Sequence, residues 1–291
     1  MEPPILENAL IWYARRFPIP GGKLRVINSC WRTAIADNGS LRVATLTHGG
    51  LKMRCDLNEM LQRQFYFFGT YFVERDILKC WEIAAKDAKI VFDVGANGGI
   101  FSLAALAVQR NATVHAFEPT PEIATRLRET ATLNGLHHLH VHRVAVLETS
   151  GTAALRRFRG ECGTNEGMNF VTTEPGDCGN ERVESVCLDQ FCRDRRIEYV
   201  DLLKLDIQGQ EYSALLGSER LLTAGRIGSV FTELNWVNSP GDVCTATESI
   251  LLLDRAGYRF SRPGKRLTWV KAGDWLRSLS NVIARRSRGS F

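Results

Sequence analysis

The sequence predicts an α/β protein. We expect a Rossmann-like sheet of seven mostly parallel strands with helices on both faces, preceded by an N-terminal extension of a helix and a hairpin. From Lys89 onward, apolar runs of strand length alternate with segments of helical periodicity. The segment Ile90–Phe101, IVFDVGANGGIF, runs from an apolar strand through a glycine-rich turn into an apolar helix. Such sheets bind ligands at the carboxyl ends of their strands, so the functional residues are expected there.

The alternation assigns seven strands and five helices to the main domain. Strands are expected near residues 90–95, 113–118, 139–146, 201–207, 227–234, 257–262 and 267–271. Helices are expected near residues 99–110, 121–134, 189–195, 209–224 and 245–256. Ahead of the first strand, residues 65–86 begin with aromatic residues and become helical in pattern.

The chain is expected to divide into three parts. Residues 1–60 form the extension, residues 61–272 form the main domain, and residues 273–291 form a basic C-terminal tail. Within the extension, apolar residues recur at helical spacing over residues 1–20, and alternating residues with glycine pairs follow over residues 22–60. The first stretch predicts an amphipathic helix and the second predicts short strands or a hairpin.

One stretch, residues 159–181, interrupts the alternation. It carries five glycines and little periodicity. Long irregular segments in a compact domain are usually functional or disordered. Because it follows the third strand, we expect this loop to cover the substrate.

Composition and charge narrow the class of protein. The 291 residues are 44% hydrophobic and 24% charged, which is ordinary for a folded domain, and the net charge is +5. No run of about 18 apolar residues occurs, so no membrane-spanning helix is expected. The N-terminus has an early acid and early prolines and does not resemble a signal peptide, so we expect a cytoplasmic protein. The eight cysteines include no C-x-x-C pair and are expected to be reduced and structural.

The C-terminal tail carries a basic cluster. Its arginines are Arg277, Arg285, Arg286 and Arg288. A solvated terminus is the favoured interpretation, and contact with nucleic acid or an anionic membrane is the alternative.

The glycine turn has a pattern that suits S-adenosylmethionine (SAM). A dinucleotide fingerprint starting at Gly95 would need glycines where Asn97 and Ile100 stand. The pattern present is D-x-G-x-N-x-G, formed by Asp93, Gly95, Asn97 and Gly99. Glycines let the backbone turn sharply and let a ligand come close. An acid two residues before the turn can accept hydrogen bonds from turn amides or reach an ammonium group, and SAM carries such a group.

The second and third strands predict the rest of the cofactor site. Glu118 lies at the carboxyl end of the second strand, where a carboxylate can bind both ribose hydroxyls. Its alternative role is to stabilise the start of the helix that follows Pro119. Pro119 is also an expected cofactor-binding residue, and Ala145, after the third strand, is expected along the adenine.

Charged residues lie at the end of the fourth strand, where the methyl group of SAM is expected. Lys204 and Asp206 are two apart and point to the same face of the strand. Asp206 is a candidate base or orienting group with Lys204 lowering its pKa or that of the acceptor, and the alternative is a structural ion pair. Glu211, in the first turn of the next helix, is a candidate catalytic residue whose alternative role is capping.

The fifth strand completes the expected acceptor pocket. Glu233 and Asn235 share a face, and Trp236 follows as a wall. With Gln208, they are the expected substrate-binding residues. A divalent ion held by acids and Asn235 is kept as an alternative, but no metal is assigned. His115 is expected to be a buried structural residue; His137, His138, His140 and His142 are expected at the surface.

Several segments together resemble the FkbM-like family of SAM-dependent methyltransferases. They are FDVGANGGIFSL at 92–103, FEPTPE at 117–122 and LLKLDIQGQEYSALLG at 202–217, supported by 62–78 and 185–192. The resemblance covers about residues 50–260. It implies a class I methyltransferase sheet, SAM as the cofactor, and methyl transfer to hydroxyl oxygens of natural products or sugars. Gln208 departs from the family pattern, which usually has a carboxylate at that position.

Two other functions remain as alternatives. An N-methyltransferase acting on a small molecule or nucleic acid is one, although the fourth strand reads Asp206-Ile207-Gln208-Gly209 instead of the N/D-P-P-Y/F/W motif of many base methyltransferases. A non-catalytic SAM-binding module is the other, and the intact Asp93, Gly95 and Glu118 disfavour it. We expect a small-molecule or sugar acceptor and no nucleic acid, and no motif identifies the acceptor or the oligomeric state.

Overall fold

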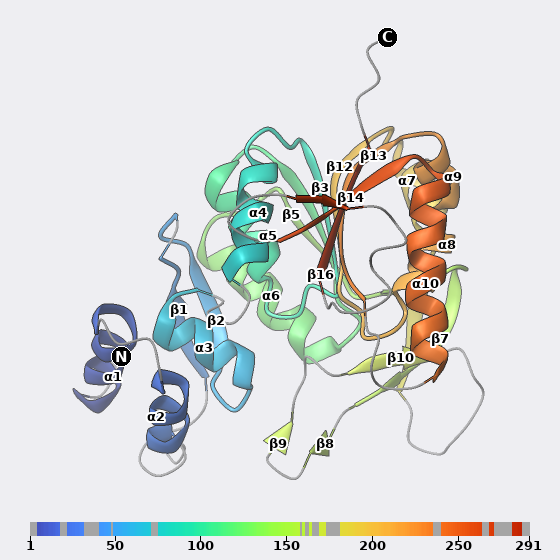
Figure 1. The fold of residues 1–291 in the computed structure, drawn as a ribbon. Helices are drawn as coiled ribbons and strands as arrows, with labels where there is room; N and C mark the ends of the chain where they lie inside the picture. Colours follow the sequence, from blue (N-terminus) through green and yellow to red (C-terminus); the bar gives the residue numbers. More distant parts are fainter. Residues whose placement is uncertain are drawn as a thin grey trace.

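The computed structural model describes residues 5–17, 22–31, 41–47, 49–70, 75–157, 159–160, 163–164, 169–172, 181–234, 240–263, 268–270 and 281–286. An eight-stranded sheet forms its centre (Figure 1). In spatial order its strands are β5 (Leu139–His142), β4 (Thr113–Phe117), β3 (Ile90–Val94), β12 (Val200–Leu205), β13 (Ile227–Glu233), β16 (Asn281–Arg286), β14 (Tyr258–Arg262) and β15 (Thr268–Val270). In the described ranges, no helix has the length and apolar character needed to cross a membrane.

The predicted mostly parallel α/β sheet is confirmed. The five strands from β5 to β13 run parallel to one another. β16 is antiparallel to both of its neighbours, β13 and β14. β15 adds an eighth strand at the edge, antiparallel to β14.

The position of β16 corrects the expected C-terminus. The predicted seventh strand over residues 267–271 is present as β15, but residues 273–291 were expected to be a tail. The structure instead inserts β16 between β13 and β14, so a boundary at residue 272 cuts through the sheet. Its centre, Val282 to Ala284, is fully buried. In the sequence, this short apolar run is the only sign of a strand, and the arginines beside it made the segment resemble a solvated tail. In the structure, Arg286 donates hydrogen bonds to the carbonyls of Leu222 and Thr223.

Helices cover both faces of the sheet, each over its own apolar core. On one face lie α4 (Arg75–Ala85), α5 (Ile100–Val108) and α6 (Pro121–Leu133); on the other lie α7 (Leu188–Arg195), α8 (Glu211–Leu216), α9 (Glu219–Thr223) and α10 (Pro240–Arg255). The predicted helix over 209–224 is divided into α8 and α9. A side chain at Gly217 between them would lie 2.2 Å from the carbonyl oxygen of Leu147, so this close packing requires glycine.

A second, four-stranded sheet lies beside the carboxyl ends of the main strands. Its order is β10 (Phe170–Thr172), β7 (Gly151–Arg156), β11 (Glu181–Val186) and β6 (Ala145–Val146). The predicted third strand over 139–146 is therefore two strands, β5 and β6, in different sheets. Within the stretch predicted as an irregular loop, the described residues form β10, the start of β11 and the pair β8 (Arg159–Gly160) and β9 (Gly163–Thr164).

The N-terminal extension contains the predicted helix and hairpin. They are α1 (Ile5–Arg16) and the antiparallel pair β1 (Leu41–Thr45) and β2 (Lys52–Asp56). Two further helices were not predicted. They are α2 (Lys23–Cys30), where strands were expected, and α3 (Met60–Phe68). In α2, Ile27 is buried and Val26 is exposed, which is the one-sided burial of a surface helix.

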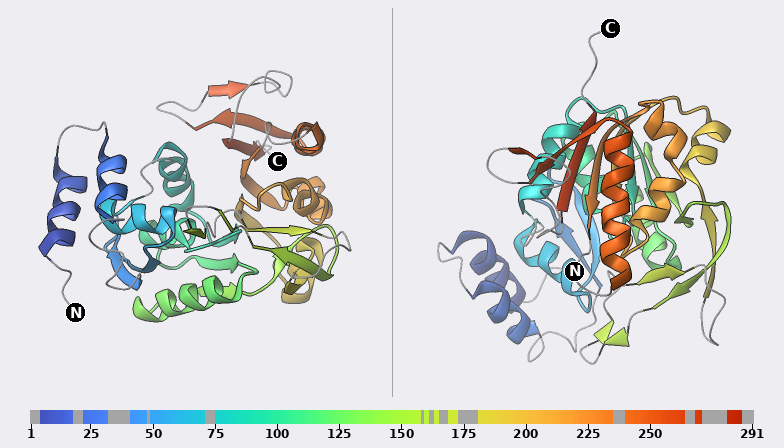
Figure 2. Two further views of the ribbon diagram at one scale, coloured as in Figure 1. Left: turned by 90° about the horizontal axis from the view of Figure 1, so that it is seen from below. Right: turned by 45° about the vertical axis from the view of Figure 1, so that its right-hand side comes forward.

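The extension has a layered arrangement. α1 and α2 lie at one end of the molecule, with α3 and the hairpin between them and the main sheet (Figures 1 and 2). The hairpin reaches the glycine turn directly. A side chain at Gly98 would lie 2.4 Å from the methyl carbon of Met53 in β2. The division of the chain at residue 60 remains a prediction.

Candidate active site

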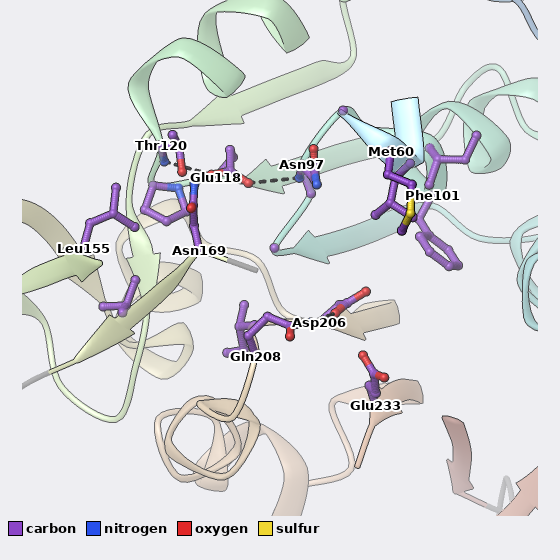
Figure 3. A pocket seen from close by; sticks show the side chains of 18 of the residues that line it. Met60, Asn97, Phe101, Glu118, Thr120, Leu155, Asn169, Asp206, Gln208 and Glu233 are labelled. Carbon is purple, nitrogen blue, oxygen red and sulfur yellow. Dashed lines mark hydrogen bonds between the residues drawn. The ribbon is translucent and has the colours of Figure 1, made fainter. Parts of the chain in front are cut away.

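A cavity of about 260 Å³ opens where β3, β4, β12 and β13 end. Its walls comprise Met60, Leu61 and Phe65 of α3; Gly95, Ala96, Asn97, Gly98, Ile100 and Phe101 after β3; Glu118, Pro119 and Thr120 after β4; Leu155, Asn169 and Val171 in and beside the second sheet; Asp206, Ile207 and Gln208 after β12; and Glu233 of β13. In Figure 3, Asn97 and Glu118 lie across the cavity from Asp206, Gln208 and Glu233. The cavity therefore lies at the strand ends, where sheets of this kind are expected to bind ligands.

The glycine turn brings the ends of three strands together. Gly95 has φ +77°, and a Cβ there would lie 1.9 Å from the carbonyl oxygen of Asp206. The amides of Gly95 and Ala96 both donate to the carbonyl of Phe117 at the end of β4, at 3.0 Å each. Any side chain at Gly95 would separate the turn from the fourth strand.

Asn97 lines the cavity and has an unused acceptor. Its amide donates to Oε2 of Glu118 at 3.0 Å, and its backbone is left-handed, with φ +47°. Its side-chain Oδ1 is buried and has no hydrogen-bond partner among the described residues. Because buried polar atoms are normally satisfied, this atom is suited to a donor group of a ligand.

Glu118 contacts the start of α6, as its alternative role predicted, and also lines the cavity. Its Oε1 accepts from the amide of Thr120 at the start of α6 at 2.8 Å, and its Oε2 accepts from Asn97. The carboxylate also lines the cavity although the residue is only 6% exposed. Each carboxylate oxygen has two acceptor positions, so ribose hydroxyls can still bind.

Asp93 and Gly99 support the turn from beneath, which corrects their expected direct contact with the cofactor. Asp93 is buried, and its Oδ2 accepts from the amide of Ser102 at 2.9 Å and from its hydroxyl at 2.6 Å. Burial raises the pKa of this carboxyl group. A Cβ at Gly99 would meet Leu127 of α6 at 2.3 Å. Neither residue lines the cavity, because both face the helices that pack under the turn.

Pro119 and Ala145, two of the expected cofactor-binding residues, both line a cavity. Pro119 lines the main cavity and also a smaller one of about 20 Å³. Ala145 lines only the smaller cavity, whose other walls are mainly apolar and include Val171 of the second sheet. The two cavities share Gly95, Pro119, Val171 and Ile207, so they adjoin.

Lys204 and Asp206 form an ion pair in which only the acid faces the cavity. Lys204 is 1% exposed, and its Nζ lies 3.2 Å from Oδ2 of Asp206 and 4.8 Å from the ring centre of Phe101. The Asp206 side chain is 30% exposed and lines the cavity. The expected direct role of Lys204 is corrected to one of holding Asp206, because the ammonium group is covered.

The loop after β12 is held by Glu211. Its carboxylate accepts from the amides of Ile207 at 3.0 Å and Gly209 at 2.9 Å. Glu211 is 5% exposed and does not line the main cavity, and burial raises the pKa of its carboxyl group. The structure therefore gives it the capping role, in place of the expected catalytic one. The loop places Gln208, with φ +52°, in the cavity wall, where its amide nitrogen donates to Oδ1 of Asp206 at 3.2 Å.

Glu233 lines the cavity as expected for a substrate-binding residue. Asn235 and Trp236 lie outside the described residues. The alternative of a divalent ion held partly by Asn235 therefore remains a prediction.

Two sets of cavity residues had no role in the sequence analysis. Met60, Leu61 and Phe65 come from α3, and Leu155 comes from β7. The aromatic segment ahead of the first strand was the available signal for α3. The long loop predicted over the substrate includes Asn169 and Val171, which do line the cavity.

The histidines at the outer strands differ in part from expectation. His115 is buried, as predicted. His142, expected at the surface, is half-buried: its ring stacks on His115 at 5.2 Å, and Nδ1 of His115 lies 3.0 Å from Nε2 of His142. Burial lowers the pKa of His115 to about 3 and that of His142 to about 4. Neither residue lines the cavity.

Comparison with known proteins gives one family and several relatives. A family model described as "Methyltransferase FkbM domain" matches residues 93–260, more than half of the chain. The "2-O-methyltransferase NoeI" of Sinorhizobium fredii is 26% identical over 172 residues, which cover 55% of this chain and 68% of the relative. The "31-O-demethyl-FK506 methyltransferase FkbM" of Streptomyces tacrolimicus is 28% identical over 182 residues, covering 53% and 68%.

Solved structures are similar to this chain at low sequence identity. One is an O-methyltransferase from Bacillus cereus in complex with SAH, which covers 96% of this chain and 97% of that one with a TM-score of 0.45 and 11% identity.

Proposed function

We propose that this chain, which belongs to the methyltransferase FkbM domain family, methylates a hydroxyl oxygen of a small molecule or sugar, with SAM as the methyl donor. One observation supports this most strongly. A single cavity combines a ribose-competent carboxylate, Glu118, with two further carboxylates, Asp206 and Glu233, on the opposite wall. The first suits a nucleoside, and the other two suit the removal of a hydroxyl proton.

The residues present fit SAM. Glu118 is proposed to bind the ribose hydroxyls, and the orphan Oδ1 of Asn97 is proposed to accept from the ammonium group or a hydroxyl of the cofactor. Gly95 lines the cavity and lets the turn approach the end of β12, and the methionine part is proposed to lie against this turn. Pro119 and Ala145 are proposed to line the adenine pocket. Asp93 and Gly99 act indirectly, by fixing α5 and α6 under the turn.

The chemistry requires alignment and the loss of one proton. SAM supplies a methyl group on a positively charged sulfur, which leaves as a neutral thioether. The acceptor oxygen forms the new bond to carbon, and its proton passes to a carboxylate of the protein. Asp206 is the proposed base because both of its oxygens are held, one by Lys204 and one by Gln208. Glu233 is proposed to bind the acceptor on the neighbouring strand.

Transfer to oxygen is favoured over transfer to nitrogen. The names of both relatives specify methylation at oxygen. A fixed carboxylate suits a hydroxyl, whose proton must leave as the bond forms. The N-methyltransferase and the non-catalytic binding module are the competing functions.

Calorimetry and mass spectrometry test this proposal in two steps. Titration of SAM into the purified chain should show binding at one site. Incubation with SAM and a panel of hydroxyl and amine acceptors should then add one methyl group to a hydroxyl compound. Absence of SAM binding by folded protein would contradict the proposal, and products from amines alone would favour the N-methyltransferase.

A further inference from the structure

We propose that helix α3 recognises the methyl acceptor and that this acceptor carries an apolar group beside its reacting hydroxyl. The inference rests on the proposed function, because it names the class of substrate for the same cavity. It assigns acceptor recognition to a helix outside residues 93–260, the part of the chain that matches the family model.

The cavity has two ends, and the nucleoside part of the methyl donor SAM is proposed to occupy one of them. In Figure 3, Leu155 and Asn169 lie toward one end, Met60 and Phe101 toward the other, and Glu118 and Asn97 between them. A nucleoside held at Glu118 continues toward the second sheet through the adjoining small cavity. The end near Met60 is therefore left for the methionine part and the acceptor.

The acceptor end is apolar apart from its carboxylates. Met60, Leu61 and Phe65 of α3 face the cavity together with Ile100 and Phe101 of α5. Asp206 and Glu233 supply negatively charged oxygens at this same end. A molecule with hydroxyls on every side would leave several of them unpaired against hydrocarbon, which is unfavourable. An acceptor with a hydroxyl next to an alkyl or ring surface can place the hydroxyl at the carboxylates and the apolar surface against the apolar side chains.

Met60 has the properties of a ligand contact more than those of a core residue. Its side chain is 41% exposed, although it lines the cavity. Unbranched methionine adapts to irregular apolar surfaces, which suits a binding wall. Phe65, in contrast, is buried and also belongs to the apolar core.

Side-chain hydrogen bonds fix the position of α3 before any ligand binds. Gln62 accepts from the amide of Asp56 in β2 at 2.7 Å, which ties α3 to the strand that packs on the glycine turn. The hydroxyl of Tyr66 donates to the buried carboxylate of Glu7 in α1 at 2.6 Å. Gln62 and Tyr66 are four residues apart, so contacts from two different elements hold the same face of the helix.

Arg15 adds a third attachment at the carboxyl end of α3. Its guanidinium donates to the carbonyls of Tyr66 and Phe67, at 3.1 Å each, and to the carbonyl of Thr45 in β1. Last-turn carbonyls lack partners within a helix, so these bonds complete the helix end. The apolar wall is therefore preorganised, which reduces the entropic cost of binding a rigid acceptor.

A matched pair of glycosides tests the preference. The full chain is saturated with S-adenosylhomocysteine, the demethylated form of SAM, and titrated by calorimetry with octyl β-D-glucoside below its micelle concentration or with methyl β-D-glucoside. The two ligands share the sugar and differ only in the alkyl group. Octyl glucoside should bind at least about tenfold more tightly, because each buried methylene is favourable. Equal affinities would overturn the inference.

Variants locate the alkyl group on α3. The double variant Met60→Gln with Leu61→Asn should reduce the octyl preference about tenfold, as polar side chains replace the apolar contact. Ile83→Asn is the matched control, because Ile83 is 63% exposed on α4 and lies away from the cavity. It should keep the full preference. An equal loss in the control would show nonspecific detergent binding, and an unchanged preference in the double variant would exclude α3; either result overturns the inference.

The affinity for S-adenosylhomocysteine separates this inference from the proposed function. If that ligand binds and a hydroxyl is methylated without any alkyl preference, the role of α3 is wrong and the proposed function stands. If the double variant loses affinity for S-adenosylhomocysteine as much as for octyl glucoside, α3 contacts the donor and the inference fails. If the wild-type chain binds no S-adenosylhomocysteine, both fail.

Discussion

Asp206 accepts a hydrogen bond from Lys204 through one carboxylate oxygen and from Gln208 through the other. Position 208 usually carries a carboxylate in the family, and this arrangement explains how glutamine can replace it. An amide can donate to Asp206, whereas a second carboxylate there would repel it. Gln208 is thus compatible with activity, and its replacement of an acid orients the proposed base.

Replacing Asp206 separates chemistry from cofactor binding. Asp206→Asn should lower turnover by about two orders of magnitude, because an amide cannot take the acceptor proton. SAM affinity should change little, since the ribose carboxylate is on another strand. Turnover is measured as transfer of labelled methyl, and affinity by calorimetry. Asp254→Asn on the exposed side of α10 is the charge-matched control; unchanged turnover in Asp206→Asn would remove this residue from the chemistry.

Glu118 tests the cofactor site. Glu118→Gln should weaken SAM binding by about tenfold to a hundredfold, because a bond between a ribose hydroxyl and a charged group contributes about 1.5–3 kcal/mol. Calorimetric titration measures this change. Glu122→Gln is the control, since Glu122 is exposed near the start of α6 and pairs with Arg157 at the surface. Equal SAM affinity in Glu118→Gln and wild type would refute the ribose assignment.

The glycine turn is the element on which the site depends, because it brings β3, β4 and β12 together. Gly95→Ala should destabilise the fold by about 3 kcal/mol or more, as it adds a backbone clash to a left-handed conformation. Gly135→Ala, at φ +61° with open space around it, should cost only about 1–2 kcal/mol. Urea unfolding of both variants measures the difference. Similar losses would mean that the turn relaxes away from Asp206 without cost.

The edge of the sheet formed by β4 and β5 should make the fold sensitive to acid. The folded-state pKa values of His115 and His142 lie below the ordinary value of 6.5. The unfolded chain therefore binds protons first as pH falls. The contribution of these residues to stability, complete above pH 6.5, is lost between pH 6.5 and about 4 for His142 and between pH 6.5 and about 3 for His115. Thermal melts of His142→Gln across this range should show a smaller loss of stability than wild type.

The control for this pH experiment is the exposed His138. His138→Gln should keep the wild-type dependence on pH, because this side chain is exposed and lies outside the buried histidine pair. Parallel profiles for wild type and His142→Gln would show that the histidine pair does not couple folding to pH.

The whole molecule depends on its C-terminal segment, which was expected to be a solvated tail. A chain ending at residue 272 lacks β16, so β13 and β14 lose their shared neighbour and the apolar core loses Val282, Ile283 and Ala284. It should fail to fold cooperatively, whereas a chain ending at Arg286 should melt like the full chain. Circular dichroism compares the two. A cooperative transition near the wild-type temperature in the shorter chain would contradict the insertion of β16.

By itself, the sequence determined the sheet class, the glycine turn and the strand ends that carry Glu118, Asp206 and Glu233. These features are local: hydrophobic periodicity marks each parallel strand, and the carboxyl ends of parallel strands lie at one edge. The predictions that failed concerned side-chain direction and distant packing. Asp93, Gly99 and Glu211 occur at the expected spacing, yet each is turned into the surrounding structure.

Only the tertiary structure decided which residues face the cavity and which distant segments complete it. β16 pairs with β13 although the two are far apart in the chain, and its short apolar run gave no periodic signal. Helix α3 reaches the cavity because hydrogen bonds to Glu7 and Arg15 hold it there. Such contacts depend on the relative placement of whole elements, which local periodicity does not contain.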